Sequence, residues 1–136
     1  MRIETNEYRE IAHRALKRLL ANGRLTAVPK RPDDQEVLVA LAASQLDPQR
    51  SWLESEVNER LVTWLDTISE PFGIDHVTLR RMLVDSGLLI RTTSGSTYRI
   101  NAERLGKIEA VRGIDPAAVL AQVRAERDLR KRQHAA

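Results

Sequence analysis

Residues 75–100 read DHVTLRRMLVDSGLLIRTTSGSTYRI, and this stretch decides the fold. Its first half has helical period, because apolar residues recur at steps of three and four behind Asp75, a favoured N-cap residue. Gly87 ends the helical pattern. Apolar and polar residues then alternate on both sides of a polar, glycine-containing turn, which is typical of a hairpin. The stretch therefore predicts a helix at 75–86 followed by a β-hairpin at 88–100.

Three further helices are predicted upstream. The first carries an apolar stripe over residues 8–20 and ends at Asn22-Gly23, where glycine suits the left-handed cap position. The second begins at Asp33 as N-cap, with Glu36 three residues later, and stops at Asp47-Pro48. The third spans roughly residues 54–68.

Two short segments between these helices have extended character. Residues 25–28 follow a short apolar-alternating pattern and are followed directly by Pro29, which predicts a brief edge strand. The segment 50–53 contains Trp52, and either segment would complete a small sheet with the hairpin. Both tryptophans, Trp52 and Trp64, fall in register with apolar neighbours, so we expect them in the core.

The C-terminal segment differs in character from the rest. Asp115-Pro116 predicts a helix start with proline at the first helical position. Val119, Leu120 and Val123 form a narrow apolar stripe, and arginines dominate after it. Such a stripe suits docking onto a partner or onto the domain itself. We therefore divide the chain into a domain at 1–101 and a C-terminal helical extension at 102–136.

The order of these elements predicts an α+β, mostly helical fold of winged helix-turn-helix type, with a small antiparallel β-hairpin wing and an extra C-terminal helix. In this architecture the helix before the hairpin is the candidate recognition helix. Helix-turn-helix units also serve as dimerisation and docking modules, so the order alone leaves the function open.

One ordered set of residues resembles a bacterial domain family of unknown function, found alone or fused behind a helix-turn-helix regulator. The resemblance covers roughly residues 15–100 and rests on Gly23-Arg24-Leu25, Val28 to Arg31, Glu54 to Asn58 with Leu61, Asp75, Leu79 to Asp85, Arg91, Gly95 and Tyr98. It implies a winged-helix-like fold and an association with transcriptional regulation, and it implies no known reaction. Three departures are Leu53 in place of a capping serine, a longer link between Trp64 and Ile74, and Arg99 in place of an aromatic residue.

Composition excludes several classes of site. The 136 residues include no cysteine, so disulfides and thiolate zinc sites are excluded. The three histidines lie far apart in sequence, so we expect no metal, and no motif indicates a cofactor. No apolar run has the length of a signal peptide or a membrane span, which favours a cytoplasmic protein.

Charge is strongly banded along the chain. Residues 1–32 hold eight Lys and Arg against three Asp and Glu, whereas residues 33–75 hold two against ten. The remaining residues are basic again. Banding of this kind steers a polyanion to one face or brings opposite patches of two proteins together.

The candidate nucleic-acid contacts lie on the predicted recognition helix and wing. Guanidinium groups bind guanine edges and phosphates bidentately, and the candidates are Thr78, Arg80 and Arg81 on the helix and Arg91 and Arg99 on the hairpin. The alternative is structural, because Arg80 or Arg81 can pair with Asp85, Glu56 or Glu59 and tie two helices together. The acidic residues of the preceding helix also count against DNA, since that helix crosses the phosphate backbone.

Two functions remain open. The first is a transcription-regulator-type domain that binds double-stranded DNA through residues 75–86 and 88–100. The second is a protein-interaction or dimerisation module, as a homodimer or with a regulatory partner, without DNA binding. We do not expect an enzyme, because no carboxylate has a histidine or lysine placed as its partner, and no nucleophile elbow or phosphate loop occurs.

Overall fold

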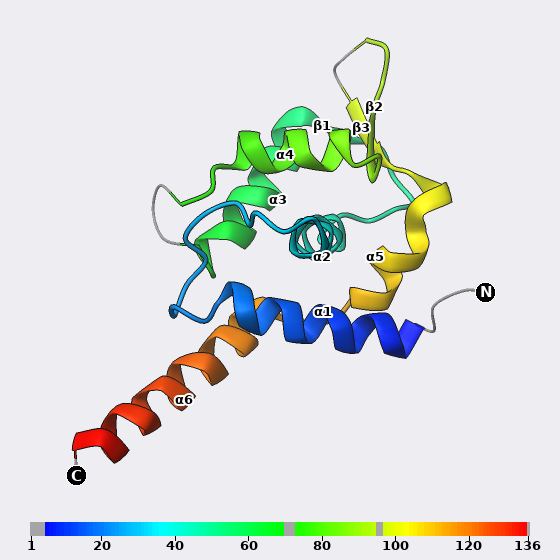
Figure 1. The fold of residues 1–136 in the computed structure, drawn as a ribbon. Coiled ribbons are helices and arrows are strands. Elements are labelled where there is room, and N and C mark those ends of the chain that lie inside the picture. The colour runs from blue at the N-terminus through cyan, green and yellow to red at the C-terminus, as the bar shows by residue number, and fades with distance from the viewer. Residues whose placement is uncertain (1–4, 70–72, 95–96, 136) are drawn as a thin grey trace.

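The computed structural model describes residues 5–69, 73–94 and 97–135 (Figure 1). Its elements, in chain order, are α1 (Thr5–Leu19), α2 (Pro32–Ala43), β1 (Trp52–Leu53), α3 (Glu54–Asp66), α4 (His76–Asp85), β2 (Leu89–Arg91), β3 (Thr97–Ile100), the 3-10 helix η1 (Ala102–Arg104), α5 (Leu105–Val111) and α6 (Pro116–Ala135). The predicted turns at 70–73 and 93–96 fall partly outside the described residues.

The middle of the chain has the order of a winged helix: α2, β1, α3, α4, β2, β3. The strands form one antiparallel sheet in the order β1-β3-β2, with Trp52 opposite Tyr98 and Leu89 opposite Ile100. The hairpin of β2 and β3 extends outward beside α4 (Figure 1). The predicted fold class is confirmed: the chain is α+β, mostly helical and winged-helix-like, with a long C-terminal helix.

Local capping explains where α3 and α4 begin. The Asp75 carboxylate accepts a hydrogen bond from the Thr78 backbone N–H at 2.7 Å, as the sequence predicts, and Gly87 ends the helix with a φ of +80°. At α3 the N-cap residue Leu53 has no side-chain acceptor. The Glu56 carboxylate instead reaches back to the Leu53 backbone N–H at 2.8 Å, which is half of a capping box.

Two local predictions are wrong. Residues 25–28 form no strand; Leu25 makes one isolated parallel bridge with Ser69, and the segment then turns toward Pro29, which has no N–H for a ladder. Helix α2 begins at Pro32 rather than behind an Asp33 cap, and no side chain caps it. Proline at the first helical position lacks one of the unpaired N–H groups that a cap would satisfy.

The core extends beyond the winged helix on both sides. Helix α1 packs against α2, α5 and α6, and neither η1 nor α5 was predicted from the sequence. Both tryptophans are buried as predicted, with 3% of Trp52 and 6% of Trp64 exposed. Buried residues from both sides of position 101, including Leu16, Leu41 and Ile108, belong to one core. The division at 101 stays a prediction.

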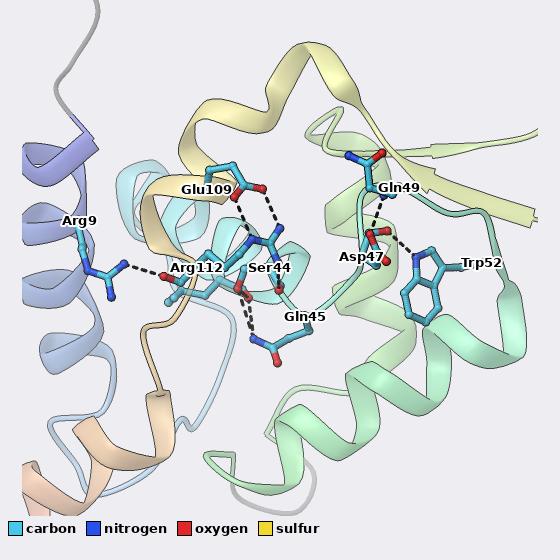
Figure 2. A network of polar contacts seen from close by, with 9 residues as sticks. Arg9, Ser44, Gln45, Asp47, Gln49, Trp52, Glu109 and Arg112 are labelled. Atoms are coloured by element: carbon cyan, nitrogen blue, oxygen red, sulfur yellow. Dashed lines mark hydrogen bonds and ion pairs between the residues drawn. The ribbon is translucent and has the colours of Figure 1, made fainter.

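A set of polar contacts joins α1, the end of α5 and the loop before β1 (Figure 2). Arg9 donates to the backbone carbonyls of Ala110 and Arg112, at 3.1 and 2.7 Å. Arg112 in turn donates to the carbonyl of Ser44 at 2.9 Å, at the end of α2. The loop that follows is fixed by the Trp52 indole N–H, which donates to the Asp47 carbonyl at 3.1 Å. These contacts join α1 to α5 and α5 to the end of α2, from which the loop leads to β1.

Within the ranges that the structure describes, no helix combines the length and the apolar character that a bilayer crossing requires.

Candidate nucleic-acid interface

Helix α4 presents one exposed arginine to solvent. Leu79 and Leu83 are fully buried against the core and fix the orientation of the helix. The opposite side carries Arg81, which is exposed and makes no ion pair with any described residue. Thr78 is half-buried, and its backbone N–H is already engaged by the Asp75 cap.

The rest of this solvent face is not basic. Helical spacing places Val77, Val84 and Asp85 around Arg81, and Asp85 is exposed while both valines are half-buried. A helix of this composition offers one strong donor that could reach a base edge or phosphate, flanked by apolar surface and one carboxylate.

Arg80 points away from this face and joins α4 to α3. Its guanidinium donates to the side-chain oxygen of Asn58 and lies 3.5 Å from the Glu54 carboxylate. Only 16% of the Arg80 side chain is exposed. The sequence left open whether Arg80 pairs with Asp85, Glu56 or Glu59; its partners are Asn58 and Glu54. Its role as a DNA contact stays a prediction, whereas the contacts make it a bridge between two helices.

Glu54 also binds the hairpin. The Tyr98 hydroxyl donates to the Glu54 carboxylate at 2.8 Å. This hydrogen bond, ahead of the Arg80 guanidinium, holds the pKa of Glu54 below its ordinary value. Burial, followed by the hydrogen bond to Glu54, raises the pKa of Tyr98. Tyr98, Glu54 and Arg80 therefore form one cluster that connects β3, α3 and α4.

The two hairpin arginines lie on opposite faces of the sheet. Arg91 pairs with Tyr98, so both point to the face that meets α3, and its guanidinium lies 6.0 Å from the centre of the tyrosine ring. Arg99 pairs with Ile90 and points to the other face. Both arginines are exposed. Strand pairing thus brings Arg91 near the Glu54 cluster and does not bring Arg99 there.

Part of the acidic band before α4 is neutralised internally. The Glu56 carboxylate accepts hydrogen bonds from the Leu53 backbone N–H and from the Arg50 guanidinium, the latter at 2.6 Å, and these bonds, the Leu53 bond first, lower the pKa of Glu56. Glu59 and Asp66 remain exposed on α3. The carboxylates at the start of α3 therefore repel phosphate less than their number indicates.

A groove of about 950 Å³ lies behind the C-terminal end of α4. Val39, Ala40 and Met82 contribute apolar lining, and an ion pair between Glu36 and Lys107 connects its α2 and α5 walls.

A second hollow of about 700 Å³ is lined by Trp64 and by the link between α5 and α6. The Trp64 indole N–H is buried, and no described residue accepts its hydrogen bond. Among the described residues, no group of three histidines or carboxylates gathers to hold a metal ion.

Sequence reasoning missed the Glu54–Tyr98 contact. Both residues belong to the ordered set that carries the family resemblance, which is the signal that singles them out. Their pairing depends on the register of β1 on β3, because Glu54 follows β1 directly and Tyr98 lies opposite Trp52. The hydrophobic periodicity of the sequence alone does not determine that strand register.

The chain matches one family model, over residues 24–100, described as an uncharacterized protein conserved in bacteria (DUF2087). No curated protein and no solved structure matches it. The matched range agrees with the resemblance found over residues 15–100, while the fusion to helix-turn-helix regulators stays a prediction. The matched range, residues 24–100, contains α2, β1, α3, α4 and both hairpin strands, which together are the whole winged-helix unit. The chain therefore belongs to this uncharacterized bacterial family.

Proposed function

We propose that this protein is a cytoplasmic, winged-helix regulatory domain that binds double-stranded DNA, with α4 in the major groove and the hairpin on the adjacent phosphates. The observation that carries the proposal is the arrangement of α4: a capped, well-packed helix precedes an antiparallel hairpin and exposes Arg81. The support is architectural, because a winged helix also serves other functions. No reaction and no cofactor is part of the proposal.

The candidate residues take different roles in this proposal. Arg81 is the donor to a base edge or phosphate, and Thr78 lies near it at the first turn of the helix. Arg91 and Arg99 contact phosphates from the wing. Arg80 is a positioning residue, because Glu54 and Asn58 already hold its guanidinium.

Fluorescence anisotropy with a labelled mixed-sequence duplex tests the proposal directly. We expect binding that weakens steeply between low and physiological salt, since each neutralised phosphate releases counterions. Arg81→Ala should lower the affinity roughly tenfold, on the scale of one lost arginine contact of about 1–3 kcal/mol, with an unchanged urea midpoint. Absence of duplex binding at low salt, or an Arg81→Ala affinity equal to wild type, contradicts it.

One observation favours a second candidate, a homodimerisation module. Leu53, the last residue of β1 and the N-cap residue of α3, is 53% exposed, and Val62 on α3 is 39% exposed. The next helix, α4, also has two half-buried valines near its solvent face. Analytical ultracentrifugation over a hundredfold range of protein concentration tests whether the protein forms a dimer. Concentration-dependent association that Leu53→Ser abolishes supports the dimer, and a monomer at every concentration removes it.

A further inference from the structure

The second half of α6 extends past the body of the protein. Val119, Leu120 and Val123 in the first half are buried, whereas every residue described from Asp128 onward is exposed. Figure 1 shows α6 leading away from the other helices toward the C-terminus. We call residues 127–135 the basic arm.

One face of α6 changes chemistry where the helix leaves the body. The buried positions recur at helical spacing from Pro116 to Val123. Continued by the same steps of three and four, this face carries Arg127, Arg130, Lys131 and His134. These four residues, with Ala135, line a hollow of about 540 Å³. The side of α6 that is apolar against the body is therefore cationic along the arm.

Contacts at the base hold the arm in one direction. The Arg124 guanidinium donates to the Gly23 carbonyl at 2.9 Å, and the Arg127 guanidinium lies directly over Gly23. A side chain at position 23 would collide with it. Lys17 of α1 lies 3.5 Å from the Glu126 carboxylate. The arm thus continues a helix that is anchored on α1 and on the loop after it.

The charge of the arm is strongly positive. Residues 127–135 contain four cations and one carboxylate, Asp128, and three of the cations are Arg130, Lys131 and Arg132. Within the described part of the chain, none of these three has an ion-pair partner. A ligand that complements closely spaced cations carries closely spaced anions, and the phosphate backbone of nucleic acid does so along its whole length.

Two other occupants fit less well. An interfacial membrane helix needs a broad apolar face, and Leu129 is the one large apolar side chain between residues 127 and 135. Pairing with the arm of a second copy would bring like charges together, which is unfavourable at helix–helix distances. Charge therefore favours a polyanion over a bilayer or a homodimer at this face.

We propose that the basic arm binds the phosphate backbone of nucleic acid and supplies affinity that does not depend on sequence. The proposal deepens the proposed function, because the arm adds phosphate contacts outside α4 and the hairpin. Its cationic face is Arg127, Arg130, Lys131 and His134. Arg132 lies on the opposite side of the helix and contributes less.

The test compares Arg130→Gln/Lys131→Gln with wild type on two unrelated duplexes. The plot of log affinity against log salt should become shallower by about 1.8, because each lost phosphate contact removes about 0.9 from the slope. Affinity at low salt should fall roughly tenfold, and equally on both duplexes, since phosphate contacts carry no sequence information. The urea midpoint should not change, because these side chains are exposed.

Two single variants provide the matched control. Arg130→Gln and Arg132→Gln remove the same charge two residues apart, on opposite sides of one helix. A larger loss of affinity in Arg130→Gln supports a specific face. An equal loss in both variants, or an unchanged slope in the double variant, overturns the proposal.

The outcome separates the arm from the proposed function. If the arm variants lose affinity and Arg81→Ala does not, the arm binds DNA and α4 is rejected as the DNA contact. If Arg81→Ala loses affinity and the arm variants do not, the proposal for the arm is rejected. Vesicles of anionic phospholipid test the other source of phosphate. Arm-dependent vesicle binding without duplex binding assigns the arm to a membrane surface and overturns the proposal.

Discussion

At the scale of single residues, neighbouring arginines on α4 have different tasks. Arg80 is largely covered and bonded to two residues of α3, whereas Arg81 is exposed. Sequence spacing places the two 100° apart on the helix and assigns neither task. The partners of Arg80 become visible only when α3 and α4 are packed, since Asn58 lies twenty-two positions away.

Arg80→Ala should therefore destabilise the fold by about 1–2 kcal/mol, because it leaves the Asn58 side chain without its donor and removes a covered side chain. Arg81→Ala is the matched control and should change the free energy of unfolding by less than about 0.5 kcal/mol. Urea unfolding measures both. Equal effects of the two substitutions would show that Arg80 does not hold the helices together.

The Glu54–Tyr98 hydrogen bond predicts a dependence of stability on pH. The folded-state pKa of Glu54 lies below its ordinary value, so Glu54 stabilises the fold above its unfolded pKa, and this stabilisation is lost as pH falls through the folded pKa. Tyr98→Phe removes the largest cause of that shift. The difference in stability between wild type and Tyr98→Phe should narrow from neutral to acidic pH, measured by urea unfolding. A difference that stays constant across this range would contradict the assignment.

At the scale of elements, the sequence predicts the Asp75 cap and two left-handed glycines correctly, because a local contact decides each of them. Asp75 caps α4, and Gly23 and Gly87 adopt positive φ, as their positions in the sequence indicate. The wrong cap at Asp33 has a local cause, because Pro32 begins α2 without one. The error at residues 25–28 has a tertiary cause. They alternate like a strand, but no strand among the described residues lies alongside them, and Leu25 makes one isolated bridge with Ser69. Helix α5 has seven residues, too few for its period to stand out.

Asp75→Ala should destabilise the protein by about 1 kcal/mol, because the Thr78 N–H loses its acceptor. Asp75→Ser keeps a capping oxygen and should retain most of the stability. Thermal or urea unfolding of the three proteins gives the comparison, and equal losses in Asp75→Ala and Asp75→Ser would refute the role of the cap.

Two glycines give opposite expectations for the same substitution. Gly87→Ala should cost about 1–2 kcal/mol, because φ is +80° and the new Cβ would lie 3.2 Å from Arg104 Nε. Gly106→Ala, inside α5, should stabilise by about 0.5 kcal/mol, because the site is open and alanine favours helix. Urea midpoints that shift in the same direction for both would contradict this.

At the scale of the whole molecule, the candidate site divides into parts that sequence does and does not reveal. Helix α4 and the β2–β3 hairpin follow from hydrophobic periodicity and turn residues. The placement of Arg91 and Arg99 on opposite faces follows from strand register, which no local pattern in the hairpin fixes. The change of α6 from packed helix to basic arm depends on where the body ends, and only the folded chain defines that point.

The same helix provides a stability test. Leu120→Ala should cost about 2–4 kcal/mol, because this side chain is 4% exposed in the core that α6 shares with α1. Leu129→Ala, nine residues later and 52% exposed, should change stability by less than about 0.5 kcal/mol. Similar losses at both positions, measured by urea unfolding, would mean that the arm is packed in solution.

The hydrogen bonds from Arg9 to the carbonyls of Ala110 and Arg112 join segments that are made at different times during synthesis. Helix α1 can pack against α2 early, whereas α5 and α6, which cover the rest of it, are translated about a hundred positions later. At 5–20 residues per second, the apolar stripe of α1 waits roughly 5–20 s for α5. The winged-helix segment can form in that interval, while α1 remains available to chaperones. The apolar stripe of α1 is thus partly exposed to misassociation until α5 and α6 have been made.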